Sequence, residues 1–194
     1  MDTLAPPKIS AEAYLEQERQ GQEKHEYHDG IIVPMSGASI IHTIICGNIY
    51  ALVWNFTRNR DFTAHTSDLR VFVPKTQRYV YPGVVIIQGE PAVTDERKDV
   101  VTNPMLVVEI LSESTEAYDR GDKFESYRTI DSLQEYVLVS QEKPHIEVFS
   151  RDSIGSVWKL TEASGLESSI ELPALGLTLS LTNVYAKVNF EERI

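Results

Sequence analysis

One glutamate, Glu109, stands inside a very apolar stretch of the sequence. Residues 105–111 read MLVVEIL, a run of aliphatic and β-branched side chains typical of a strand that is covered on both faces. An ionised carboxylate in such surroundings is costly unless it is paired with a positive charge. Glu109 therefore needs either a cationic partner or a bound metal ion.

Lys123, on the segment that follows this strand, is a candidate for the cationic partner. Residues 115–130 have the pattern of a polar helix, in which Asp119, Lys123 and Tyr127 recur at every fourth position and share one face. If this helix folds back beside its strand, Lys123 can reach Glu109. The alternative is an exposed ion pair between Asp119 and Lys123, which would contribute little to stability.

A tight hairpin is predicted near the N-terminus. Residues 24–28 and 31–35 flank Asp29-Gly30, a dipeptide that fits a two-residue hairpin turn. On such a strand Glu26 and His28 point to the same face, whereas His25 and His28 point to opposite faces and make a poor shared metal site. We interpret both histidines as solvated polar residues.

The remaining elements follow from the hydrophobic periodicity. We expect helices at residues 10–20, 39–60, 115–130 and 181–188, and strands at 62–66, 69–73, 79–88, 105–111, 135–140, 145–151 and 156–162. Residues 74–78 suit a hairpin connection, and residues 89–103 a charged loop. In the long helix at 39–60, we interpret His42 as structural or solvated and Cys46 as a buried, inert thiol. Helices around a strand-rich centre predict one α/β domain with a central sheet, and 194 residues suit a single domain.

The net charge of −11, from 18 basic and 29 acidic residues, argues against non-specific DNA binding over a broad surface. A nucleic-acid role must therefore depend on a local basic patch, a metal or a partner. The start MDTLAPPK lacks the pattern of a signal peptide, and no apolar run approaches the length of a membrane span. We expect a cytoplasmic protein without a membrane partner. The common phosphate-loop, dinucleotide and zinc motifs are absent from the sequence, so no organic cofactor is expected.

Four segments, in this order and spacing, resemble the Uma family of restriction-endonuclease-like proteins, a branch of the PD-(D/E)XK nuclease superfamily. They are HEYHDG, YPGVVIIQGEP, NPMLVVEILSESTEAYDRGDKFESYR and SLQEYVLVSQ, and the resemblance spans residues 9–188. It implies a mixed central sheet flanked by helices, with additional antiparallel strands. It also implies hydrolysis of DNA phosphodiester bonds that depends on Mg²⁺ or Mn²⁺, carried out by a homodimer.

The same resemblance implies roles for individual residues. Glu109 matches the metal-binding glutamate, and Lys123 matches a catalytic lysine that this branch carries on the following helix instead of two places after the glutamate, where Leu111 stands. Glu26 matches an acidic residue from the N-terminal region. Asp68 matches a recurring family aspartate, and its alternative role is that of a turn residue capping a strand.

Gly83 departs from the superfamily pattern, because the first metal-binding aspartate normally follows the proline at position 82. Mg²⁺ usually takes one or two carboxylates, so the site would lose one expected ligand. One hypothesis is that Asp68 or Glu26 substitutes for it; a local kink at the glycine is the structural alternative. Three functions stay open: an endonuclease that is weakened at this position, an inactive pseudo-nuclease that binds DNA or protein, and an oligomerisation module.

Overall fold

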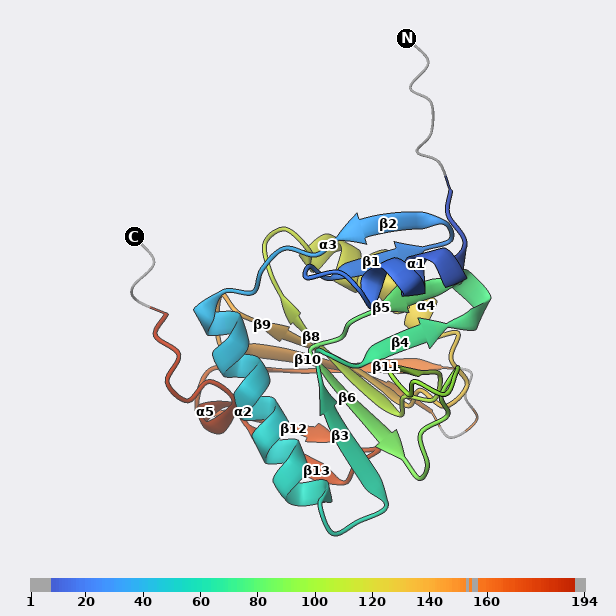
Figure 1. Ribbon diagram of the computed structural model, residues 1–194. Helices are drawn as coiled ribbons and strands as arrows, with labels where there is room; N and C mark the ends of the chain where they lie inside the picture. The colour runs from blue at the N-terminus through green and yellow to red at the C-terminus, as the bar shows by residue number, and fades with distance from the viewer. Residues whose placement is uncertain (1–7, 153, 155–156, 191–194) are drawn as a thin grey trace.

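A six-stranded mixed sheet forms the centre of the computed structural model, which describes residues 8–152, 154 and 157–190 (Figure 1). Its strands run in the order β11-β10-β9-β8-β6-β3, and β8 and β9 are the parallel pair among antiparallel neighbours. The bounds are β3 (Phe62–Thr66), β6 (Val84–Gln88), β8 (Leu106–Leu111), β9 (Glu135–Ser140), β10 (His145–Arg151) and β11 (Trp158–Ser164). The expected mixed sheet flanked by helices is confirmed.

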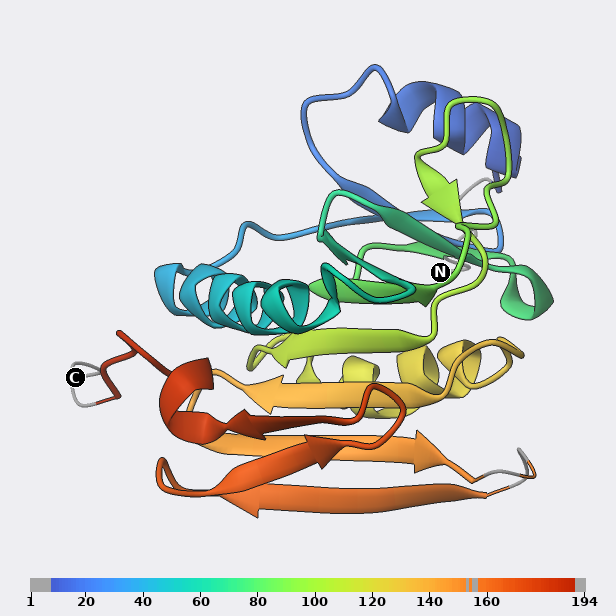
Figure 2. The same ribbon diagram turned by 90° about the horizontal axis from the view of Figure 1, so that it is seen from below.

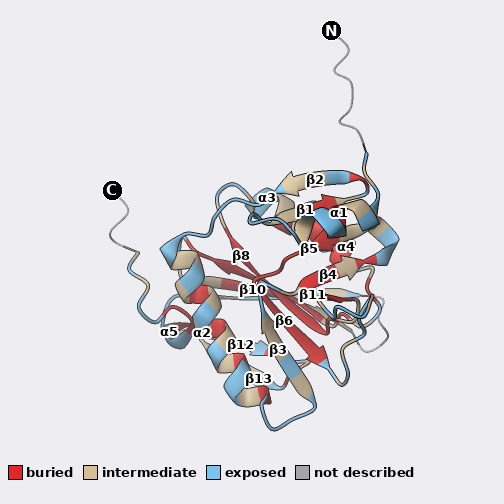
Figure 3. Ribbon diagram, in the orientation of Figure 1, coloured by how far each residue is buried: buried red, intermediate tan, exposed pale blue. Residues whose placement is uncertain are grey.

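The central strands are buried on both faces, as the red colour of β6 and β8 in Figure 3 shows. Alternate residues of β8 serve two separate cores. Leu106, Val108 and Ile110 belong to one cluster, while Val107 and Leu111 belong to the other. This period of two is the geometry of a strand, and it explains why the stretch around Glu109 is apolar almost without interruption.

Different helices cover the two faces of the sheet. One face carries α2 (Ile40–Thr57), α5 (Leu181–Val184) and the hairpin of β12 (Ser169–Leu172) and β13 (Leu177–Ser180). The other face carries the helical segment made of α3 (Glu116–Tyr118), the π-helical turn η2 (Asp119–Lys123) and α4 (Phe124–Tyr127). In Figure 2 the red C-terminal hairpin lies in front of the sheet and the yellow helical segment lies behind it.

A second, smaller sheet lies beside the first, with strand order β2-β1-β5-β4-β7 (Figure 1). Its strands are β1 (His25–His28), β2 (Ile31–Pro34), β4 (Arg70–Val73), β5 (Arg78–Val80) and β7 (Val100–Val101); the short 3₁₀ turn η1 (Pro74–Thr76) joins β4 to β5. Asp29 and Gly30 close the predicted hairpin with φ angles of 44° and 97°, the positive values that this turn requires. The helix α1 (Ala11–Glu18), capped by Ser10, packs on this sheet through Tyr14.

Several predicted elements differ from the observed ones. The strand expected at residues 79–88 is two strands in two sheets, β5 and β6, because the chain crosses between the sheets at residues 81–83, where Pro82 offers no N–H to a ladder. The loop expected at 89–103 contains β7, which pairs with β4. The helices at 115–130 and 181–188 are shorter than expected, and β11 starts at Trp158, while Ser156 lies outside the described residues.

The helix α2 corrects the expectation that no apolar segment is long enough to span a membrane. Its 18 residues have a mean hydropathy of 1.3, so by length and composition alone it could cross a bilayer. A core helix of a globular protein passes the same test, and Ile45, Ile49 and Val53 of α2 are fully buried against the sheet and its neighbours. This helix is weak evidence for a membrane span.

Candidate active site

The ammonium group of Lys123 lies among three carboxylates. Its Nζ atom is 2.9 Å from Glu109 Oε1, 3.2 Å from Glu26 Oε1 and 3.4 Å from Asp119 Oδ1. All four side chains are almost completely buried. They come from three elements, β8, β1 and η2, so strands from both sheets and a helical turn meet here. We call Glu26, Glu109, Asp119 and Lys123 the carboxylate cluster.

The turn after β8 brings the helical segment back against its own strand. The amide of Glu116 donates to the Ser112 carbonyl (2.9 Å), which closes the turn and starts the helix. The helical face that carries Asp119, Lys123 and Tyr127 points at the strand, as expected. Lys123 and Tyr127 both contact Glu109, and the Tyr127 hydroxyl donates to Glu109 Oε1 at 3.2 Å. The segment widens into a π-helical turn at residues 119–123, a local distortion that occurs often at functional sites.

Burial and charge act against each other in this cluster. Burial raises the pKa of Glu109 to about 8, although Lys123 beside it favours the ionised form. Burial also raises the pKa of Asp119. For Glu26 burial opposes ionisation, but Lys123 and His28 hold its pKa at about 2. Burial favours the neutral form of Lys123, yet Glu109 and Glu26 keep its pKa above the ordinary value, so one ammonium faces three carboxylates that it does not fully compensate.

Glu26 is fixed by contacts on its outer side. His28 Nε2 lies 3.1 Å from Glu26 Oε2 and 3.0 Å from the Tyr118 hydroxyl, and the His28 and Tyr118 rings stack. The amide of Tyr81, at the crossing between the sheets, donates to Glu26 Oε1 at 3.4 Å. The interpretation of His28 as a solvated residue was therefore wrong. His25 is partly exposed, and its Nδ1 lies 3.1 Å from Glu18 Oε2.

A cleft of about 670 Å³ opens onto the carboxylate cluster. All four residues of the cluster line it. Further lining residues are Lys24, Tyr81, Gly83, His42 and Tyr118. A small polar substrate group or an ion can thus reach Glu109, even though the carboxylate sits in a buried strand.

Gly83 lies in this cleft, directly before β6, and its surroundings leave little room for a side chain. A Cβ atom built there would lie 3.2 Å from the Val108 carbonyl oxygen and 3.4 Å from Ile110 Cδ1. The close backbone approach that a glycine in an apolar strand suggests is present. The glycine supplies no carboxylate to the site, and a larger side chain there would require its neighbours on β8 to shift.

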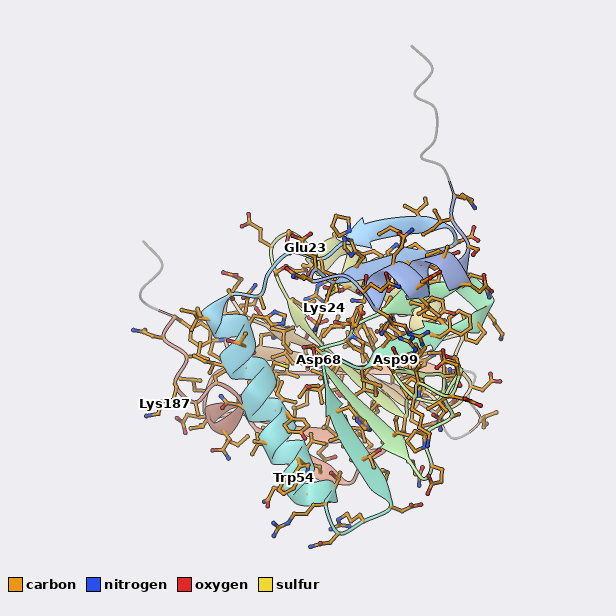
Figure 4. The ribbon with its side chains drawn as sticks, in the orientation of Figure 1. Glu23, Lys24, Trp54, Asp68, Asp99 and Lys187 are labelled. Carbon is orange, nitrogen blue, oxygen red and sulfur yellow. The ribbon has the colours of Figure 1, made fainter. Side chains whose placement is uncertain are left out.

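Asp68 lies outside the carboxylate cluster. Its side chain is 84% exposed and its Oδ1 lies 2.5 Å from Lys24 Nζ; Figure 4 labels both residues. The third carboxylate near Lys123 is Asp119, which the helical spacing had linked only to Lys123. Sequence reasoning also assigned no functional role to Tyr118 and His42. The spacing of four between Asp119 and Lys123 was the available signal for Asp119, whereas no local pattern pointed to the other two.

A second group of metal-binding residue types lies on β10 and β11. Single ligand atoms of His145, Glu147 and Glu162 come within 4.8 Å of one another. Glu147 is already engaged there, because Arg120 and His145 both bond to its carboxylate. None of these three residues lines the cleft around Glu109.

Comparison with known proteins places this geometry in a family. The Uma2 family model, described as "Putative restriction endonuclease", matches residues 11–182. The chain belongs to the Uma2 family. Two curated relatives from Synechocystis sp. (strain ATCC 27184 / PCC 6803 / Kazusa) are called uncharacterized proteins, sll1609 and slr1290. The first is 38% identical over 173 residues, covering 88% of this chain and 97% of the relative. The second is 37% identical over 186 residues, covering 95% of each.

A solved structure shares the fold of this Uma2 protein. It is titled as a putative nuclease belonging to DUF820 from Anabaena variabilis ATCC 29413, and it superimposes with a TM-score of 0.74 at 14% sequence identity. The match covers 91% of this chain and 97% of that one. At this identity the likeness shows that the two chains share an architecture.

Proposed function

We propose that this Uma2 protein is a metal-dependent endonuclease that hydrolyses DNA phosphodiester bonds at the carboxylate cluster. The observation that carries the proposal is the contact of 2.9 Å between Lys123 Nζ and Glu109 Oε1 at an open cleft, in a chain of a restriction-endonuclease family. Both groups suit metal-dependent phosphodiester hydrolysis. A carboxylate can hold the metal ion, and an ammonium group can stabilise the negative charge that develops on the phosphate.

The carboxylate oxygens of the cluster are the kind of donor that a divalent cation with a preference for oxygen binds. Three carboxylates from Glu26, Glu109 and Asp119 surround a single positive charge, and burial raises the pKa of Glu109 although that charge favours its ionised form. We assign Glu109 and Asp119 as the residues that would hold Mg²⁺ or Mn²⁺, with Asp119 in place of the aspartate missing at Gly83. When bound, such an ion polarises the scissile phosphate and lowers the pKa of a bound water.

The other residues of the cluster act on the substrate or on one another. In the proposal Lys123 donates to a phosphoryl oxygen and stabilises the charge that develops there. Glu26 holds Lys123 in the cleft, and His28 and Tyr118 hold Glu26. Tyr127 orients Glu109 by its hydrogen bond. Asp68 has no role in this proposal, because its side chain points to Lys24 and solvent.

Cleavage of supercoiled plasmid DNA tests the proposed function. With Mg²⁺ or Mn²⁺ the parent protein is expected to nick or linearise the plasmid, and EDTA is expected to stop it. Glu109→Gln keeps the shape of the side chain and is expected to lower the rate by at least about a hundredfold. Glu113→Ala, an exposed residue of the neighbouring turn, serves as the matched control and should cut at the parent rate.

A pseudo-nuclease is the second candidate function, and Gly83 favours it, because no carboxylate stands at that position. A parent protein that binds DNA in a salt-dependent manner but never cuts it would support this candidate and overturn the first. The homodimer and the cytoplasmic location stay predictions. Light scattering of the purified protein would test the homodimer, and a fluorescent fusion imaged in the source cell would test the location.

A further inference from the structure

His42 occupies the cleft without an assigned partner. It lies in the first turn of α2, and among the described residues its imidazole ring makes no hydrogen bond, although its backbone amide does. The charged groups that act on this ring most are Asp119 and Lys123, both in the carboxylate cluster. A free imidazole beside the proposed reaction centre is therefore available for chemistry.

The backbone of His42 is held in place by the cap of α2. Ser39 Oγ accepts from the His42 amide at 3.0 Å and donates to Gln141 Oε1 at 2.8 Å. Ser39 and Gln141 also line the cleft. The helix cap thus anchors the backbone of His42 to the segment after β9, at the end of an interior strand of the central sheet.

The acid groups of the carboxylate cluster, and His28 beside them, are already engaged. Glu26, Glu109 and Asp119 contact Lys123, and His28 contacts both Glu26 and Tyr118. Burial lowers the pKa of His42, which favours the neutral ring with a lone pair free to accept a proton. Glu109 and Glu26 are the remaining charged groups of the cluster that face the same cleft.

We infer that His42 is the general base of the reaction, an assignment that rests on the proposed function. The ring nitrogen takes a proton from the attacking water while the water oxygen forms a bond to phosphorus. The bond between phosphorus and the leaving sugar oxygen breaks, and that oxygen takes a proton from solvent. The imidazolium then returns its proton to solvent. A neutral histidine in this role typically contributes a rate factor of about 10² to 10⁴.

The test compares His42→Ala with the parent in single-turnover plasmid cleavage. The expected loss is about a hundredfold or more, and free imidazole added to the buffer is expected to restore part of the rate of His42→Ala but none of the rate of Glu109→Gln. His65→Ala, a histidine on β3 that does not line the cleft, should cut at the parent rate.

Two readouts separate catalysis from folding or metal binding. Circular dichroism and Mn²⁺ affinity of His42→Ala are expected to match the parent. With Ca²⁺ present to allow DNA to bind, the ring signals of His42 in NMR should shift when a short duplex oligonucleotide is added. An unchanged cleavage rate in His42→Ala, or a loss of Mn²⁺ affinity that accounts for the lost rate, would overturn the inference while the nuclease function stands. A parent that never cuts overturns both.

Discussion

At the scale of single residues, Lys123 is the positive charge on which the carboxylate cluster depends. Its side chain is 7% exposed and contacts Glu26, Glu109 and Asp119. Breaking a buried ion pair by removal of one partner leaves the other charges without compensation, which is far more costly than the pair is stabilising. A bound divalent cation would supply compensation of the same sign.

Lys123→Met keeps the length of the side chain and removes the charge. In EDTA we expect the free energy of unfolding to fall by about 3–5 kcal/mol, and addition of Mn²⁺ should recover part of it, since a ligand that binds only the folded state stabilises it. Urea unfolding with and without Mn²⁺ measures both effects. Lys75→Met, at an exposed lysine, is the control and should change little. Equal stability of Lys123→Met and the parent in EDTA would contradict the cluster described above.

Glu135, at the start of β9, is expected to make the stability of the protein depend on pH. Its carboxylate is fully buried; Oε1 accepts from the Ala174 amide and Ser150 hydroxyl, while Oε2 has no partner among the described residues. Burial raises the pKa of Glu135 to about 7 from an ordinary 4.5. The folded state therefore binds this proton more tightly than the unfolded state does. Its contribution is fully present below about pH 4.5 and is lost as the pH rises through about 7.

Glu135→Gln should remove that pH dependence. Relative to the parent, the variant is expected to gain about 3 kcal/mol of stability between pH 4.5 and pH 7.5. Urea unfolding at several pH values measures the difference, and Glu171→Gln, at an exposed glutamate, provides the control. A constant difference between variant and parent at all pH values would show that folding does not raise the pKa of Glu135.

At the scale of elements, the crossing between β5 and β6 decides the shape of the site. Residues 81–83 leave the smaller sheet and enter the larger one, which brings the Tyr81 amide to Glu26 and the Gly83 backbone to β8. The carbonyl oxygen of Val108 lies 3.2 Å from the position that a Cβ atom at residue 83 would take. An aspartate could stand here only if the backbone of β8 at Val108 shifted by a few tenths of an ångström.

Gly83→Ala is expected to destabilise the protein by about 1–3 kcal/mol, because its methyl group is forced against the Val108 carbonyl. Gly83→Asp carries the same Cβ and should lose similar stability. Gly47→Ala in α2 is the matched control: no atom lies within 4 Å of its Cβ, and alanine favours a helix by up to about 1 kcal/mol. Thermal unfolding of the three variants gives the comparison. A stable Gly83→Ala protein would mean that β6 and β8 adjust easily.

At the scale of the whole molecule, charge opposes the proposed substrate. The net charge is −11, and the cleft itself carries the carboxylates of Glu23, Glu26, Glu109 and Asp119 against Lys24 and Lys123. DNA can approach such a surface closely only if a cation reverses the local charge. The proposed metal would therefore serve binding as well as hydrolysis.

Duplex DNA is accordingly expected to bind at least about tenfold more tightly in Ca²⁺ than in EDTA at equal ionic strength. Fluorescence anisotropy with a labelled duplex measures the two affinities, and Glu109→Gln should reduce the difference between them. Equal affinity in EDTA would instead indicate a basic DNA-binding surface elsewhere on the molecule.

The sequence by itself determined the local parts of this protein. The apolar run with Glu109 predicted a buried strand, because period-two burial on both faces needs apolar residues at nearly every position. Asp29-Gly30 predicted the hairpin through its backbone preference. The spacing of four residues put Asp119, Lys123 and Tyr127 on one helical face, so the contact between Lys123 and Glu109 followed once the helix folded back.

Only the tertiary structure decided which distant residues meet. Glu26 reaches Lys123 because β1 pairs with β5 and the chain then crosses into the central sheet, and strand pairing over such separations has no local signal. The same topology leaves Asp68 at the surface, brings His42 into the cleft and divides the predicted strand at residues 81–83. Local periodicity determines the face of a helix or strand on which a side chain lies. The path of the whole chain determines which residues pack against that face.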